Sequence, residues 1–144
     1  MMALEFVVDV TPQGKQRARS GNGHHYTPQK TREYESLIAL HSKQAMIAAN
    51  LEPLTGAVRV HIVAKMPMPK SWSQKKRREM NHLPAVVKPD TDNIAKSICD
   101  AMNGIVYLDD KQVWCASVER YWDIEGSLQV VIHTDRGNDA CVTE

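Results

Sequence analysis

The chain has 144 residues, of which 42% are hydrophobic, and a formal net charge of +1. These values are typical of one globular domain and exclude a chain that is disordered throughout. No apolar run approaches the ~20 residues of a membrane span, and the N-terminus lacks a secretory pattern. The cysteines are 3 in number and show no CxxC spacing, so we expect a reduced, cytoplasmic protein with no disulfide framework and no zinc site.

The N-terminal third predicts a strand, a basic loop and a helix. Residues 4–10 alternate between apolar and polar side chains, as in a half-buried strand. The loop at residues 11–26 is rich in Gly, Ser and Asn, and its cations Lys15, Arg17 and Arg19 alternate. An extended backbone would place all three on one side, facing DNA phosphates. The same composition also suits a solvated loop without a ligand. Thr27-Pro28 then predicts the start of a helix.

A second strand and a basic arm are predicted next. Residues 57–66 alternate as in a strand, and Ser73 can cap a short helix that reaches about Asn81. The arm spans residues 67–88 and contains the cations Lys70, Lys75, Lys76, Arg77, Arg78 and Lys88. Two interpretations stay open: a solvated charged helix, or an arm that contacts DNA phosphates, with Trp72 stacking on DNA or packing against sugar.

Residues 88–113 form the most informative stretch. Asp90 or Asp92 can cap a helix that ends at Asn103-Gly104, because glycine accepts the left-handed conformation that follows a helix. The helix repeats apolar residues on one side, at Ile94, Ile98, Ala101 and Met102. We expect residues 105–108 to return in an extended conformation and to bring Asp109 and Asp110 beside the start of the helix.

Carboxylates that converge in this way repel one another unless a cation offsets their charge. Hard oxygen ligands suit Mg²⁺ or Mn²⁺, which bind a few carboxylates and keep waters or substrate phosphate in the remaining positions. A calcium loop fits poorly, because Ile94 occupies its fifth position and no glycine follows at the sixth. The alternative is an acid-capped helix followed by an ordinary Asp-Asp turn.

The last part of the chain predicts a strand at residues 112–122, a turn at Gly126 and a closing strand at residues 128–133. Residues 136–144 are polar and are expected to be a flexible tail. The order of elements predicts an α/β sandwich in a single domain of residues 1–144, with a mixed β-sheet and two main helices.

Three segments carry a resemblance to a known family: Lys88-Pro-Asp-Thr-Asp-Asn-Ile-Ala-Lys, Asp100-Ala-Met-Asn-Gly and Asp109-Asp-Lys-Gln-Val. Together they resemble the core motif of RusA-type Holliday-junction resolvases, endodeoxyribonucleases that are common in bacteria and their prophages. Weaker similarity extends upstream, to Lys15-Gln-Arg-Ala-Arg, Tyr26-Thr-Pro and the arm from Pro69. The resemblance implies a small α/β fold and a homodimer that resolves four-way DNA junctions in DNA recombination and repair.

The resemblance also implies roles for the acidic residues. Asp90, Asp92 and Asp110 would bind Mg²⁺, with Mn²⁺ as a possible substitute, and Asp109 is the weaker candidate. Lys96 would stabilise charge on the phosphate during hydrolysis. Two alternatives remain: a non-catalytic module that binds branched DNA, and a metal-dependent nucleotide phosphohydrolase. A basic loop of this size favours polymeric nucleic acid over a free nucleotide.

Overall fold

The computed structural model describes residues 1–14, 19–21, 24–26 and 29–135. Its elements in chain order are β1 (Met2–Val8), β2 (Arg19–Gly21), β3 (His24–Tyr26), α1 (Gln29–Ala48), β4 (Val58–Pro67), α2 (Gln74–Met80), α3 (Thr91–Met102), the 3₁₀ helix η1 (Asp110–Gln112), β5 (Val113–Asp123) and β6 (Ser127–Thr134). The predicted helix start at Thr27-Pro28 and the predicted tail at 136–144 lie outside the described residues.

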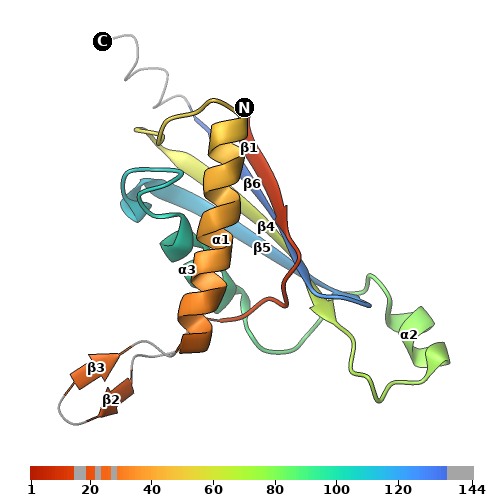
Figure 1. Cartoon of the computed structure of the whole chain (residues 1–144). Helices are drawn as coiled ribbons and strands as arrows, with labels where there is room; N and C mark the ends of the chain where they lie inside the picture. Colours follow the sequence, from red (N-terminus) through yellow and green to blue (C-terminus); the bar gives the residue numbers. More distant parts are fainter. Residues whose placement is uncertain (15–18, 22–23, 27–28, 136–144) are drawn as a thin grey trace.

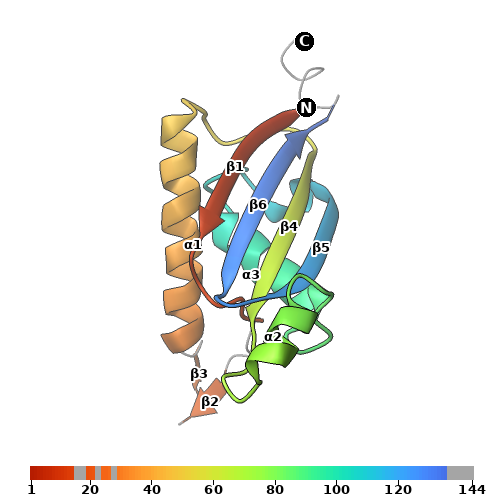
Figure 2. The same ribbon diagram turned by 90° about the vertical axis from the view of Figure 1, so that its right-hand side faces the viewer.

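A mixed sheet of four strands lies at the centre, in the order β1-β6-β4-β5 (Figure 1). β6 is antiparallel to both β1 and β4, whereas β4 and β5 are parallel. The helices α1 and α3 lie on one face of this sheet, and in the described part of the chain no helix crosses the other face (Figure 2). This arrangement confirms the predicted α/β architecture with a mixed sheet and two main helices.

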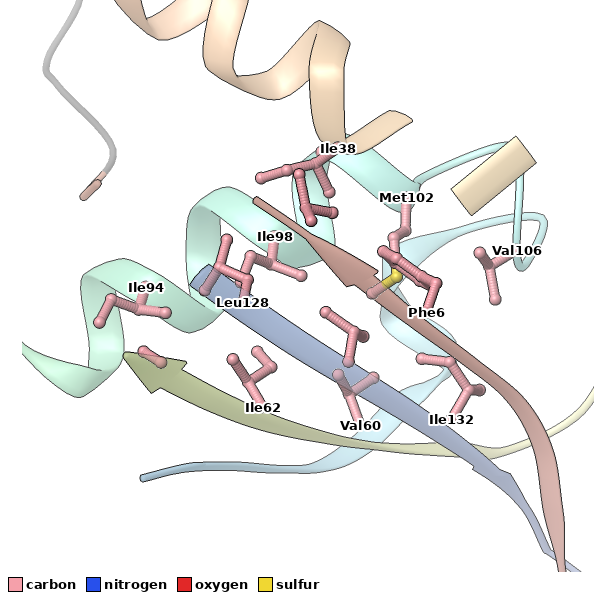
Figure 3. Packing of buried hydrophobic residues seen from close by; sticks show 14 of the residues in the cluster. Phe6, Ile38, Val60, Ile62, Ile94, Ile98, Met102, Val106, Leu128 and Ile132 are labelled. Carbon is pink, nitrogen blue, oxygen red and sulfur yellow. The ribbon is translucent and has the colours of Figure 1, made fainter. Parts of the chain in front are cut away.

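The core lies between the sheet and α3 (Figure 3). Ile94, Ile98 and Met102 project from α3 and are fully buried. They face strand residues such as Ile62 and Leu128, which are fully buried as well. Burial of each such side chain contributes roughly 1.5–3 kcal/mol, so this apolar stripe holds α3 on the sheet. The predicted periodicity of the helix is therefore confirmed.

The start of α3 is also as predicted. Asp90 is the N-cap, and its Oδ1 accepts a hydrogen bond of 2.9 Å from the backbone N–H of Asn93. Asn103 ends the helix, and Gly104 follows with φ of +79°, a conformation that glycine adopts without strain.

The segment after α3 differs from the prediction. The expected extended return over residues 105–108 is wrong, because the chain turns there instead: Gly104 N–H donates to the carbonyl of Tyr107 at 2.9 Å. Tyr107 explains the turn, since its buried ring brings its hydroxyl to the carbonyl of Cys99 at 2.6 Å. Residues 104–107 are thus held beside the second half of α3, and Asp110, which follows them, lines one pocket with Thr91 and Asp92 at the start of the helix.

Two basic segments project from one end of the molecule, the lower end in both views (Figures 1 and 2). The first carries the β2–β3 hairpin, which the sequence analysis interpreted only as a loop. Lys15 and Arg17 of this segment lie outside the described residues. The second is the arm with α2, where Ser73 caps the helix as predicted by accepting from Lys76 N–H at 3.1 Å. In the described ranges, no helix is both long and apolar enough to cross a membrane.

Candidate active site

A hollow of about 590 Å³ lies between α3, η1 and β5, and we call it the acidic pocket. The helix α3 lines it with Asp92, Lys96, Cys99 and Asp100, η1 with Asp110, and β5 with Ala116 and Val118. The helix presents these polar residues because they are spaced three or four apart, on the side away from its apolar stripe. Three carboxylates and one ammonium group therefore share one solvent-accessible space.

Lys96 forms an ion pair across one turn of α3. Its Nζ lies 3.1 Å from Oδ1 of Asp100, and the two side chains are 61% and 20% exposed, respectively. An exposed pair of this spacing contributes only ~0.3–0.5 kcal/mol to stability. Its main consequence is therefore orientation, because it holds the lysine along the wall of the acidic pocket. The contact therefore supports a role for Asp100 in orienting Lys96.

The charged residues of the acidic pocket affect the pKa of the Cys99 thiol. Burial raises the pKa of Cys99 to about 11, and the negative charges of Asp100 and Asp110 add to this effect, while Lys96 opposes them. Burial likewise raises the pKa of Tyr107, and the same two carboxylates act in the same direction. The charge of Asp110 therefore acts on the second half of α3, near Cys99 and Asp100.

Asp90 does not line the acidic pocket. It lines a different hollow and uses one carboxylate oxygen to cap α3, so the three carboxylates predicted to bind metal together are divided between two spaces. Among the residues that the structure describes, no group of three or more His, Cys, Asp and Glu residues is placed to hold a metal ion. The cap explains this division, because the hydrogen bond to the N–H of Asn93 holds the Asp90 carboxylate beside Asn93, which lines that other hollow.

A hard divalent cation nevertheless fits the chemistry of the acidic pocket. Mg²⁺ in phosphate-processing sites is usually bound by one or two carboxylates, with water and substrate phosphate as its other ligands. Asp92 and Asp110 supply two carboxylates to one pocket, so a preformed cage of three ligands is not required. We therefore regard these two residues as the candidate metal ligands of this conformation.

Asp109 has a structural role instead. Its Oδ1 accepts from Lys111 N–H at 2.9 Å, and it forms a capping box with Gln112 at the start of η1. The hydrogen bond from Lys111 lowers the pKa of the Asp109 carboxyl. The side chain of Gln112 in turn donates to two carbonyls of the segment before β4. Asp109 thus fixes the turn that presents Asp110, which agrees with its lower rank as a ligand.

Most cations of the basic arm are exposed, but one of them holds the arm together. Lys70, Lys75, Lys76 and Arg78 are exposed, but Arg77 donates from its guanidinium to the carbonyls of Trp72 and Pro69, at 3.2 Å each.

The ring of Trp72 packs at the base of this arm. It lies edge-on to Trp122, with the ring centroids 4.9 Å apart, and Nζ of Lys76 lies 4.4 Å from its centroid. The hypothesis that Trp72 stacks on DNA is therefore not favoured, because its ring already has partners on the protein.

Arg120 is a positioning residue that the sequence analysis missed. Its Nη1 donates to the carbonyl of Pro89 at 3.1 Å and also to that of Val87, so it fastens the segment that leads into α3 onto β5. The available signal was its place in the strand, where it alternates with Glu119 and Tyr121. Strand position alone does not distinguish such an arginine from a solvated one.

The sequence is similar to those of known proteins. The family model described as Endodeoxyribonuclease RusA matches residues 8–133. A protein of Bacillus subtilis (strain 168), described as uncharacterized protein YqaN, is 32% identical over 143 residues, covering 92% of this chain and 96% of that protein. The matched region contains the acidic pocket, the segment before α3 and the basic arm. The chain therefore belongs to the RusA family of endodeoxyribonucleases.

Proposed function

We propose that the protein is a Mg²⁺-dependent endonuclease that resolves four-way DNA junctions by hydrolysing two phosphodiester bonds in a paired manner. One observation carries the proposal: Asp92, Lys96 and Asp110, three residues of the family motif, line a single pocket. Carboxylates that suit a metal and an ammonium group that suits a phosphate are the two components that this hydrolysis needs.

The residues of the pocket have separate tasks. Asp92 and Asp110 would hold the metal, which when bound supplies Lewis acidity and a more acidic water. Lys96 is 61% exposed, so its ammonium group can contact a phosphate oxygen from solvent. Its positive charge would stabilise the negative charge that grows on the phosphate during attack. Asp100 would keep Lys96 on the pocket wall, and Asp90 would set the start of the helix that carries them both.

The basic segments would hold the DNA. Both are attached to the start of α3: Gly14 lies close to Pro89 and Asn93, and the arm continues through Val87 and Pro89 into the N-cap of the helix. Cations on such segments neutralise phosphates without reading sequence. This arrangement would bring a DNA backbone to a pocket whose own charge repels phosphates.

We also propose that the active form is a homodimer. A four-way junction is close to two-fold symmetric and requires two matched nicks, and an isologous dimer supplies two matched pockets. This part of the proposal comes from the symmetry of the substrate and from the family resemblance.

Replacing one carboxylate tests the assignment of the pocket. Asp92→Asn or Asp110→Asn should abolish cleavage of a synthetic junction while junction binding is kept or improved, because one negative charge near the phosphate is removed. Asp9→Asn is the matched control, since Asp9 is exposed and does not line the acidic pocket. Undiminished cutting by both pocket variants would contradict the assignment. Binding without cutting by the unmodified protein, in Mg²⁺ or Mn²⁺, would favour a non-catalytic module.

A further inference from the structure

A second hollow, of about 920 Å³, lies beside the first turn of α3. Its polar walls are Gln13 near the start of the basic loop, Lys30 in the first turn of α1, Lys88 and Asp90 before α3, and Asn93 in α3. None of these residues lines the acidic pocket. Asn93 follows Asp92 by about 100° around the helix, so the two hollows occupy different faces of the same turn.

The walls of the second hollow are held in place. Ser97 of α3 is fully buried, and its hydroxyl donates to the carbonyl of Gln13 at 3.2 Å. Gly14 lies so close to the helix that an added Cβ would be 3.0 Å from the Cβ atoms of both Asn93 and Pro89. The start of the basic loop is therefore held against the helix that carries Asp92, and these contacts fix one wall of the second hollow.

The chemistry of this space suits a nucleotide. Lys30 and Lys88 are exposed cations that can neutralise a phosphate. The side-chain amide of Asn93 forms no hydrogen bond within the described part of the chain, so both its donor and its acceptor are available there. Pro89, which is partly exposed, adds apolar surface for a base. The volume falls within the ~300–1,000 Å³ of small-ligand sites.

We propose that the second hollow is a nucleotide subsite, which takes a nucleotide that flanks the scissile phosphate near the branch point. Lys30 and Lys88 contact its phosphate, and the amide of Asn93 contacts the edge of its base. Bases at a branch point can leave the stack, and an exposed base edge is read by hydrogen bonds from side chains. This inference rests on the proposed function, and it gives the protein a means to prefer particular bases at the cut.

The test is an abasic scan measured by binding. Junctions that lack one base at successive positions near the branch point are titrated, in EDTA, against the unmodified protein and Asn93→Ala. The substitution keeps the backbone N–H that donates to Asp90, so the cap of α3 remains. For the unmodified protein, loss of the base at one position should weaken binding roughly 5- to 100-fold, the scale of a good side-chain contact to a base. Asn93→Ala should bind that abasic junction and the intact junction equally.

A second pair of variants tests the phosphate contact. Lys30→Ala should reduce the slope of log affinity against log salt by ~0.9 or less, the value for one phosphate that the protein no longer neutralises. Lys43→Ala is the matched control, because Lys43 is an exposed lysine of the same helix and does not line the second hollow.

Two results would overturn the subsite. One is that removing a base weakens junction binding by the same factor for Asn93→Ala as for the unmodified protein at every position. The other is equal slopes for Lys30→Ala and Lys43→Ala. Binding in EDTA needs no catalysis, so either result is distinguishable from failure of the proposed nuclease activity. If only the nuclease activity failed, the binding effects of Asn93→Ala and Lys30→Ala would appear as predicted, but the unmodified protein would not cut the junction in Mg²⁺.

Discussion

Lys96 has two possible roles, and its surroundings allow them to be separated. As a counter-ion it would stabilise α3 through Asp100, but a pair with a lysine that is 61% exposed contributes only ~0.3–0.5 kcal/mol. As a group that acts on the phosphate, it would matter mainly in the transition state. The small size of the first effect means that a large loss of rate cannot come from destabilisation.

We therefore predict that Lys96→Met folds normally, binds junctions normally, and loses roughly two orders of magnitude or more in single-turnover rate. That loss corresponds to the ~3–4 kcal/mol of one missing electrostatic donor. The control is Asp100→Asn, which keeps the lysine and removes the carboxylate partner; its loss of rate should be much smaller. Recovery of the full rate of Lys96→Met at high Mg²⁺ would show that Lys96 is only a counter-ion.

At the scale of the element, two substitutions of the N-cap residue Asp90 distinguish its role in helix stability from a role in catalysis. Asparagine caps helices about as well as aspartate, whereas alanine at this position costs ~0.5–2 kcal/mol. Asp90→Asn should therefore keep the thermal stability of the protein, and Asp90→Ala should lower it. Cleavage should be lost in both variants if the carboxylate is needed for chemistry. Full cleavage by Asp90→Asn would instead leave Asp90 as a cap alone, which its separation from the acidic pocket allows.

The basic arm gives a prediction of the same kind. Lys75 and Arg78 are exposed on α2, whereas the guanidinium of Arg77 binds two carbonyls at the base of the arm. Replacing Lys75 and Arg78 by Ala should weaken binding to all DNA sequences and lower the salt slope by ~0.9 for each phosphate that is no longer neutralised. Arg77→Ala should lower the melting temperature as well. An unchanged salt slope for the variant that lacks Lys75 and Arg78 would indicate that α2 is a solvated helix that does not contact DNA.

Sequence periodicity predicted the elements but not the connections between them. The apolar stripe and the cap of α3 follow from local chemistry, and both are confirmed. The turn at residues 104–107 depends on Tyr107 reaching the carbonyl of Cys99, a contact that only the packed core determines. The same holds for the bulge in β5, where Arg59 pairs with Cys115 and Trp114 is the extra residue.

The candidate site shows the same division between local and tertiary information. The spacing of Asp92, Lys96 and Asp100 on a helix places them on one side, and the structure brings them together with Asp110. The separation of Asp90 and the contribution of β5 were not predictable, because they depend on how the segment before α3 and the strand pack in three dimensions. The β2–β3 hairpin was missed because its short strands lack a long alternating pattern.

At the scale of the whole molecule, the basic segments are separate from the acidic pocket. Two basic segments project from one end of a fold whose acidic pocket lies between α3, η1 and β5. The basic segments would bind DNA phosphates, and cleavage would occur only where the DNA enters the acidic pocket. A branched DNA with two-fold symmetry, cut by two protomers, fits this arrangement.

The most direct measurement uses a four-way junction extruded from a supercoiled plasmid, with the matched plasmid lacking the junction as the control substrate. Paired nicks across the junction within one binding event convert the circle to a linear product, whereas independent nicks accumulate nicked circles. We predict linear product from the junction plasmid in Mg²⁺, none in EDTA, and none from the control plasmid. Equal cutting of both plasmids, or binding of the junction with no cutting in Mg²⁺ or Mn²⁺, would contradict this prediction.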